Sequence, residues 1–250
     1  MNINDFLIHE RFKRNIAVEM VGLEGQQKLL KKNVLIAGAG GLGSGVIASL
    51  VSSGIGSIGI IDSDRVELSN LNRQFIHNEA DIGKFKVDSA YEWVQAYSPK
   101  INISVYNQRI EDNTDYSFFQ EYDLVIDCFD SYISKFVLNR ICVKKSVPMI
   151  HGGVKDFYGQ VFTIIPGESA CLNCLFEDPD MEIEKTIGII SPTVNVISSL
   201  QSMEAVKFML GLRQILADTL LTYDGTSQDF RKINLKRKET CSVCGDYRQK

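Results

Sequence analysis

The sequence has little excess charge and no long apolar run, and these absences exclude several classes of protein. Its formal net charge of −4 provides no basic surface of the kind that attracts nucleic acid or an anionic membrane. No apolar run approaches the roughly 18 residues that a membrane-spanning helix requires. The first residues, MNINDFLIHERFKR, lack the basic start and apolar core of a secretory signal. We therefore expect a cytoplasmic protein that binds neither nucleic acid nor membranes.

Internal repeats, low-complexity tracts and linkers are also absent. A chain of 250 residues can bury one full α/β core. We expect a single domain over 1–250, with an N-terminal arm and helix in residues 1–32. Residues 33–153 would form a nucleotide-binding part, and residues 154–250 an antiparallel part with a crossover loop and a metal site.

A glycine-rich stretch joins the first apolar strand to a helix expected at 42–53. Residues 34–43 read VLIAGAGGLG, so the glycines have the spacing G-x-G-x-x-G at Gly38, Gly40 and Gly43. This spacing provides a tight turn, a bare backbone that phosphates can approach, and close helix packing. The N-terminus of the following helix favours an anion in the turn. A purely structural glycine turn is the alternative.

The second strand supports a nucleotide site. It spans residues 57–62 and ends in Asp62, which follows Gly43 by 19 residues, close to the usual distance for a ribose-binding carboxylate. The buried strand at 123–130 ends in Asp130. Because ligands bind at the carboxyl ends of parallel strands, we expect Asp130 on the same edge of the sheet as Asp62 and the glycines.

The apolar pattern predicts an α/β, Rossmann-like fold whose sheet is mostly parallel and ends in antiparallel strands. Further helices are expected at 84–97, 131–145 and 191–210. Further strands are expected at 101–107, 147–151, 157–166, 219–224 and 230–236, the last two as a hairpin around Gly225.

Four of the six cysteines form two C-x-x-C pairs, Cys171 with Cys174 and Cys241 with Cys244. Two such pairs supply the four thiolates of a tetrahedral structural zinc site, here a zinc knuckle. Two unrelated pairs, or a redox motif, are the alternatives. A redox motif normally opens a helix near the start of a thioredoxin-like unit, and neither pair does. Cys128 and Cys142 lie in apolar segments and are expected to be core thiols.

In this order, the motifs resemble the ThiF/MoeB/HesA family, bacterial relatives of ubiquitin-activating enzymes. The resemblance rests on the basic arm at 11–14, GAGGLGS, D-x-D-x-V-x-x-S-N-L-N-R-Q-F, G-K-x-K, D-C-x-D and both C-x-x-C pairs. It covers nearly the whole chain. It implies an adenylyltransferase that uses Mg-ATP to activate the C-terminal glycine carboxylate of a small ubiquitin-like protein, commonly a sulfur carrier ending in Gly-Gly. It also implies a homodimer.

The resemblance assigns roles to the matched residues. Asp62 would hold the ribose, and the glycine backbone would approach the phosphates. Two cations, Arg73 and Lys86, would stabilise the charge of the triphosphate, Asp130 would carry Mg²⁺, and Arg14 would reach the ATP of the other subunit. The implied catalytic set is Arg73, Lys86, Asp130 and Arg14. The implied ATP-binding set is Gly38, Gly40, Gly41, Gly43, Asp62, Asp64, Asn70, Arg73, Gln74 and Lys86.

One position departs from several relatives. Where they carry a cysteine that links covalently to the carrier, this sequence has Thr186. A threonine hydroxyl is hardly ionised at neutral pH, so we expect the enzyme to stop at the acyl-adenylate. The three histidines, His9, His77 and His151, are expected to have packing or surface roles.

Three other functions are compatible with parts of this pattern. An NAD-dependent oxidoreductase would use the glycine turn and Asp62, but it would not need Arg73, Lys86 and Asp130. A non-catalytic half of a heterodimeric activating enzyme usually loses those residues, and this chain keeps them. Adenylation of a small-molecule or peptide carboxylate stays open within the adenylating class.

Overall fold

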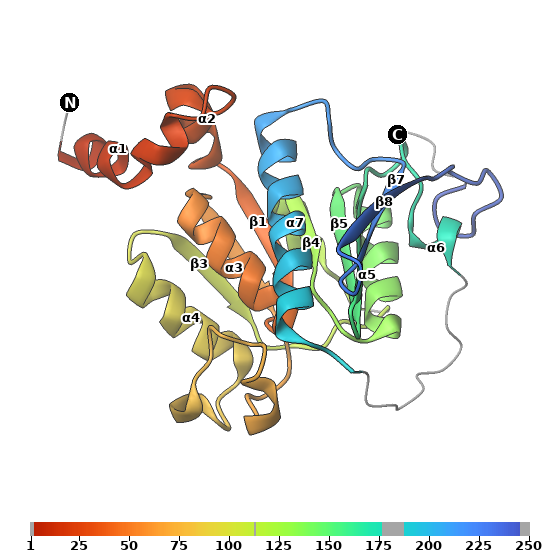
Figure 1. The fold of residues 1–250 in the computed structure, drawn as a ribbon, viewed down its shortest axis with the longest axis horizontal. Helices are drawn as coiled ribbons and strands as arrows, with labels where there is room; N and C mark the ends of the chain where they lie inside the picture. Colours follow the sequence, from red (N-terminus) through yellow and green to blue (C-terminus); the bar gives the residue numbers. More distant parts are fainter. Residues whose placement is uncertain (1–2, 113, 177–187, 246–250) are drawn as a thin grey trace.

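The computed structural model describes residues 3–112, 114–176 and 188–245, and side chains from residue 10 onward. Its centre is an eight-stranded sheet with the order β3-β2-β1-β4-β5-β6-β7-β8 (Figure 1). Neighbours from β3 through to β5 pair in parallel, and β5 to β8 pair antiparallel. The mixed sheet expected from the sequence is confirmed. The strands are β1 (Asn33–Ala37), β2 (Ser57–Ile61), β3 (Asn102–Tyr106), β4 (Leu124–Asp127), β5 (Met149–Lys155), β6 (Tyr158–Ile164), β7 (Thr219–Asp224) and β8 (Asp229–Asn234).

The elements follow the expected pattern, with differences at the N-terminus and in strand β5. The N-terminal region holds two helices, separated before Gly22, whose φ of +57° favours glycine. Strand β5 does not stop at its two glycines. Its parallel pairing with β4 ends at His151, and it continues antiparallel to β6. The helices are α1 (Ile3–Ile16), α2 (Gly22–Leu29), α3 (Gly41–Ser53), α4 (Lys86–Tyr97), α5 (Tyr132–Lys145), α6 (Leu172–Leu175) and α7 (Ser191–Leu210), with 3₁₀ turns η1 (Leu68–Asn70), η2 (Glu79–Asp81) and η3 (Ser117–Glu121). None of the helices in the described residues is long and apolar enough to cross a membrane.

Helices cover both faces of the sheet because successive side chains of each buried strand point to opposite faces. In β1, Val34 and Ile36 belong to the cluster that includes α3, α4 and α7. Leu35 and Ala37 belong to the cluster that includes α5 and the first cysteine pair. The continuous apolar run of β1 therefore reflects burial on both faces, as parallel strands between helices require.

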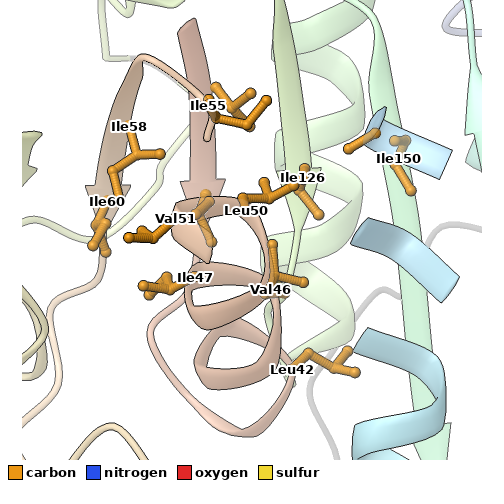
Figure 2. Close-up of a cluster of buried hydrophobic side chains, with 14 of the residues drawn as sticks. Leu42, Val46, Ile47, Leu50, Val51, Ile55, Ile58, Ile60, Ile126 and Ile150 are labelled. Atoms are coloured by element: carbon orange, nitrogen blue, oxygen red, sulfur yellow. The ribbon is translucent and has the colours of Figure 1, made fainter. Parts of the chain in front are cut away.

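Helix α3 is the centre of the first cluster. Figure 2 shows Val46, Ile47, Leu50 and Val51 directed toward the side chains of the neighbouring strands, among them Ile126. Each such side chain contributes about 1.5–3 kcal/mol on full burial. Helix α7 packs against α3 so closely that a Cβ on Gly45 would lie 2.0 Å from the Ser198 hydroxyl oxygen. This packing holds the start of α3 at a fixed place on the sheet.

The strand order creates one crevice for a ligand. From β1 the chain proceeds through β2 to β3, and it then returns to place β4 on the other side of β1. Such a reversal leaves a crevice at the carboxyl ends of the strands, where α/β folds bind their ligands. In Figure 1 this edge lies at the bottom, where α3 and α7 begin.

Candidate nucleotide site and metal centre

The first and last glycines of the turn at residues 38–43 have steric reasons to be glycine. Gly38 has a φ of +107°, and a Cβ there would lie 2.8 Å from the Cys128 carbonyl oxygen. A Cβ on Gly43 would lie 2.0 Å from the Gly38 carbonyl oxygen. The turn therefore packs tightly against the end of β4 and against its own helix, as the motif predicts.

The middle of the turn faces the polar loop that the sequence places after β2. A Cβ on Gly40 would lie 3.5 Å from Gln74 Nε2, and one on Gly41 would lie 3.5 Å from Arg73 Cδ. In the described residues, no hydrogen bond engages the backbone N–H of Gly40 or of Gly41. These amides, at the N-terminus of α3, are available to an anion.

Gln74 is a further polar group at this place. Its side chain is buried, and its Oε1 has no hydrogen-bond partner among the described residues. A buried acceptor without a partner costs free energy, so a ligand or water that donates to it is favoured. Arg73 is half-buried and donates from Nη1 to the Ser69 carbonyl oxygen at 3.1 Å. The loop thus brings both predicted residues over the glycine turn.

Asp62 is buried at the end of β2 and is joined directly to the turn. Its Oδ2 accepts from the Ala39 N–H at 2.7 Å, and its Oδ1 accepts from the Asp64 N–H at 2.8 Å. Burial raises the pKa of the Asp62 carboxyl, although the Lys86 ammonium and both amides oppose the shift. The remaining lone pairs of this carboxylate can accept from ribose hydroxyls.

Lys86 is the buried cation of the site. Its side chain is 7% exposed, and its Nζ lies 2.8 Å from Oδ2 of Asp64, which is 61% exposed. The Lys86 N–H also donates to the Asp64 carbonyl oxygen at 2.9 Å, which ties the start of α4 to the exit of β2. Asn70, by contrast, accepts from the Glu67 N–H at 3.1 Å and thereby stabilises its own loop.

Asp130 lies on the same edge, and within the described part of the chain no hydrogen bond or ion pair joins it to these side chains. It is exposed and follows β4 by three residues, just beyond the carbonyl of Cys128 that packs against Gly38. An exposed carboxylate beside an anion-binding turn is a suitable ligand for Mg²⁺, which favours one or two carboxylates together with substrate phosphates.

Arg14 is the one predicted site residue that the structure separates from the rest. It is exposed on α1, and its neighbour Asn15 donates to the carbonyl oxygen of Ser53, the last residue of α3. The glycine turn is at the other end of α3. A helix of 13 residues is about 20 Å long at 1.5 Å per residue, so Arg14 cannot reach the turn of its own chain.

The four paired cysteines converge although 70 residues separate the two pairs. Their Sγ atoms all lie within 4.8 Å of one another. The Cys171–Cys241 and Cys174–Cys244 distances are 3.7 and 3.4 Å. Thiolates around tetrahedral zinc, at Zn–S distances near 2.3 Å, are about 3.8 Å apart. The cluster therefore fits the expected four-cysteine site.

Backbone amides also prepare these sulfurs for a metal. The Lys238 N–H donates to Cys174 Sγ at 3.4 Å. Burial opposes ionisation of Cys241, but hydrogen bonds from the Cys244 and Val243 amides lower its pKa to about 7. Donors that stabilise the thiolate are typical of the outer shell of metal sites. Cys128 and Cys142 differ, since burial raises the pKa of each thiol.

The structure also reveals a buried polar network that the sequence pattern did not predict. Lys135 donates to Asp127 at 3.3 Å and to the Gly152 carbonyl oxygen at 2.6 Å, and His151 Nδ1 lies 2.7 Å from Asp127 Oδ2. Burial alone would raise the pKa of Asp127, but Lys135 and His151 lower it below its ordinary value. The network joins the end of β4 to the middle of β5 and to α5. The sequence places Asp127 at the end of a buried strand, but it does not indicate its partners, because Lys135 and His151 come from other elements.

Comparison with known proteins identifies relatives over nearly the whole chain. Residues 12–243 match the ThiF family. The sequence is 36% identical to the molybdopterin-synthase adenylyltransferase of Escherichia coli, covering 94% of this chain and 96% of that protein. It is 34% identical to the sulfur carrier protein adenylyltransferase of Thermus thermophilus, covering 95% and 91%.

Other matches are to longer proteins. The chain spans 55% of the adenylyltransferase and sulfurtransferase MOCS3 of Culex quinquefasciatus, at 34% identity over 94% of this chain. Among solved structures, E. coli MccB with ATP superposes with a TM-score of 0.78 at 25% identity, covering 98% of this chain and 82% of that one.

Proposed function

This chain belongs to the ThiF family, and from that premise we propose that it is an adenylyltransferase acting on a small ubiquitin-like sulfur carrier. It binds Mg-ATP at the glycine turn and activates the C-terminal glycine carboxylate of the carrier. A carboxylate oxygen attacks the α-phosphorus, and the bond from that phosphorus to the bridging oxygen breaks. Pyrophosphate leaves with the bonding electrons, and the carrier becomes an acyl-adenylate.

The observation that carries this proposal is the juxtaposition of Arg73, Lys86 and the free glycine amides around Asp62. The attacking carboxylate has a pKa of about 3.5 and is already ionised at neutral pH, so the reaction needs no general base. It needs neutralisation of the phosphate charge and an in-line orientation. Two cations and an amide cradle perform both tasks.

The two metals have separate roles in this proposal. Mg²⁺ would be held by Asp130 together with the phosphates of ATP, and it would neutralise the charge of the departing pyrophosphate. Zinc would be held by the four cysteines and would be structural, since all four ligands come from the protein. Four cysteines gathered as thiols also fit the reducing cytoplasm.

The proposal is tested by ATP–pyrophosphate exchange with carrier proteins ending in Gly-Gly, each paired with a form lacking its last glycine. We expect exchange with at least one intact carrier and none with the shortened form. Exchange that needs no carrier but is stimulated by a peptide or a small carboxylate would indicate that the substrate is a peptide or small-molecule carboxylate instead. ATP binding without exchange under any of these conditions would indicate the non-catalytic role.

The homodimer is also part of the proposal, and the place of Arg14 supports it: this residue lies about 20 Å from its own glycine turn, so a role at a nucleotide site requires a second subunit. Mixing inactive Arg14→Ala chains with inactive Asp130→Ala chains should restore up to about a quarter of the wild-type exchange activity. After subunit exchange, half of the dimers are hybrids, and one of their two sites keeps both residues. A monomer in sedimentation at micromolar concentration, or no recovery despite demonstrated subunit exchange, would contradict this arrangement.

Thr186 lies outside the described residues, so the expectation of an enzyme without a covalent carrier adduct stays a prediction. The burial of Cys128 and Cys142 supports it, because neither thiol is accessible for attack on an adenylate.

A further inference from the structure

His77 occupies a position where three parts of the nucleotide site meet. It follows Gln74 in the loop after β2, and its side chain is 5% exposed. Its Nε2 lies 2.9 Å from the carbonyl oxygen of Ala39, in the glycine turn. Its Nδ1 lies 2.7 Å from Oγ of Ser89, in α4. One imidazole thus joins the loop of Arg73, the glycine turn and the helix that begins with Lys86.

The hydrogen-bond partners define the role of each ring nitrogen. The Ala39 carbonyl oxygen can only accept, so Nε2 carries a hydrogen and donates it. Burial lowers the pKa of His77 and Lys86 acts in the same direction, whereas the hydrogen bond to Ala39 and the Asp81 carboxylate oppose the shift. The other ring nitrogen, Nδ1, is within hydrogen-bond distance of the Ser89 hydroxyl, so both nitrogens are engaged by the protein.

With the contact to His77, both backbone polar groups of Ala39, its N–H and its carbonyl oxygen, are hydrogen-bonded. Asp62 accepts from the Ala39 N–H at 2.7 Å, and His77 donates to the Ala39 carbonyl. The peptide bond that follows is trans, so the N–H of Gly40 points opposite to that carbonyl. His77 holds the Ala39 carbonyl toward the protein interior, so the Gly40 N–H points outward. Among the described residues, no acceptor forms a hydrogen bond with this N–H.

We propose that His77 is a positioning residue for the phosphates of ATP. It does not touch the nucleotide. It orients the Gly40 amide through Ala39, and it fixes the first turn of α4 through Ser89, three residues after Lys86. The inference rests on the proposed function, since it presupposes a nucleotide in the glycine turn. Its expected signature is selective: phosphate binding depends on His77, and adenosine binding does not.

The test compares two substitutions of similar size. In His77→Gln the side-chain amide can still donate to the Ala39 carbonyl, whereas His77→Leu leaves that buried carbonyl without a partner. Calorimetry should show that His77→Leu weakens Mg-ATP binding about tenfold, the effect of one lost hydrogen bond together with an unsatisfied buried acceptor. Adenosine affinity, measured by competition, should stay within about twofold of wild type, and His77→Gln should restore most of the ATP affinity.

Gln26→Leu is the matched control. Gln26 is buried, donates from Nε2 to the Ser53 carbonyl oxygen at 3.0 Å and accepts from the Asn15 side-chain amide at 3.1 Å, so leucine there also removes buried hydrogen bonds, but at the opposite end of α3. This variant should lose thermal stability to a similar degree and keep wild-type affinity for both ligands.

The outcomes separate the inference from the function on which it rests. Equal weakening of ATP and adenosine in His77→Leu, or unchanged ATP binding, would overturn the positioning role alone. ATP binding without carrier-dependent exchange would overturn the proposed activity, while the comparison of ATP with adenosine would still decide the role of His77. A wild-type protein that binds no ATP would overturn both.

Discussion

Replacing Asp130 by alanine is expected to lower carrier-dependent ATP–pyrophosphate exchange by about 10²–10³-fold, the usual effect of removing one electrostatic group that acts in the transition state. The carboxylate is exposed at the end of β4, so its removal leaves no buried cavity and should not change the fold. The substitution is expected to remove only the protein ligand that would hold Mg²⁺ near the triphosphate. The defect should lie mainly in the rate constant at saturating ATP, because in the proposed site the glycine amides, Arg73 and Lys86 would still bind phosphate.

Asp115→Ala provides the control for this experiment. Asp115 is 76% exposed and pairs with Lys145 in the last turn of α5, which begins at the site edge and ends at the opposite edge of the sheet. Removal of this carboxylate should leave exchange activity within about twofold of wild type, since it pairs only at the surface. Full exchange activity in folded Asp130→Ala protein would remove Asp130 from the proposed mechanism.

Loss of zinc should have the second large effect, on stability rather than on chemistry. Metal analysis of freshly purified protein should find about one zinc per chain, because four thiolates complete a tetrahedral site. Cys241→Ser is the most informative change, since Cys241 is the least buried of the four clustered cysteines and its loss should disturb packing least. We expect this variant to lose zinc and to unfold at a temperature lower by about 10 °C or more, because metal binding free energy is folding free energy.

Cys142→Ala separates the metal effect from a general effect of losing a core cysteine. Its thiol is buried in α5 and is not one of the four sulfurs that lie within 4.8 Å of one another, so this variant should be destabilised by packing alone and should keep its zinc. If wild-type protein purified without chelator contains no zinc, or if Cys241→Ser binds as much zinc as wild type, the four-cysteine site is refuted.

Much of the geometry of the candidate nucleotide site was predictable because its signals are local. Gly38 has a positive φ, and Gly43 packs against its carbonyl oxygen. No residue with a Cβ fits at either position, so the glycine spacing in the sequence predicts the turn. Asp62 was predictable for a similar reason: it ends an apolar strand at a fixed distance from that turn. The cysteine cluster was predictable because two C-x-x-C pairs supply the four sulfur ligands of a tetrahedral metal site.

Other contacts could not be predicted, since they join residues that only the fold brings together. From the sequence we expected a packing or surface role for His77. No sequence pattern indicates that its ring contacts Ala39, which lies 38 residues earlier in the chain. The same holds for Lys135 and His151, which converge on Asp127 from a helix and a neighbouring strand. Such contacts depend on side-chain direction and on the packing of separate elements, which periodicity does not specify.

The sequence by itself determined the order of strands and helices, the glycine turn and the cysteine pairs, because each follows from backbone sterics or from a short repeating pattern. The tertiary structure alone decided that β4 lies beside β1, that the loop of Arg73 covers the turn, and that Arg14 lies at the far end of α3. The physical reason is that burial of apolar faces selects which elements become neighbours. The polar side chains then meet wherever that packing places them.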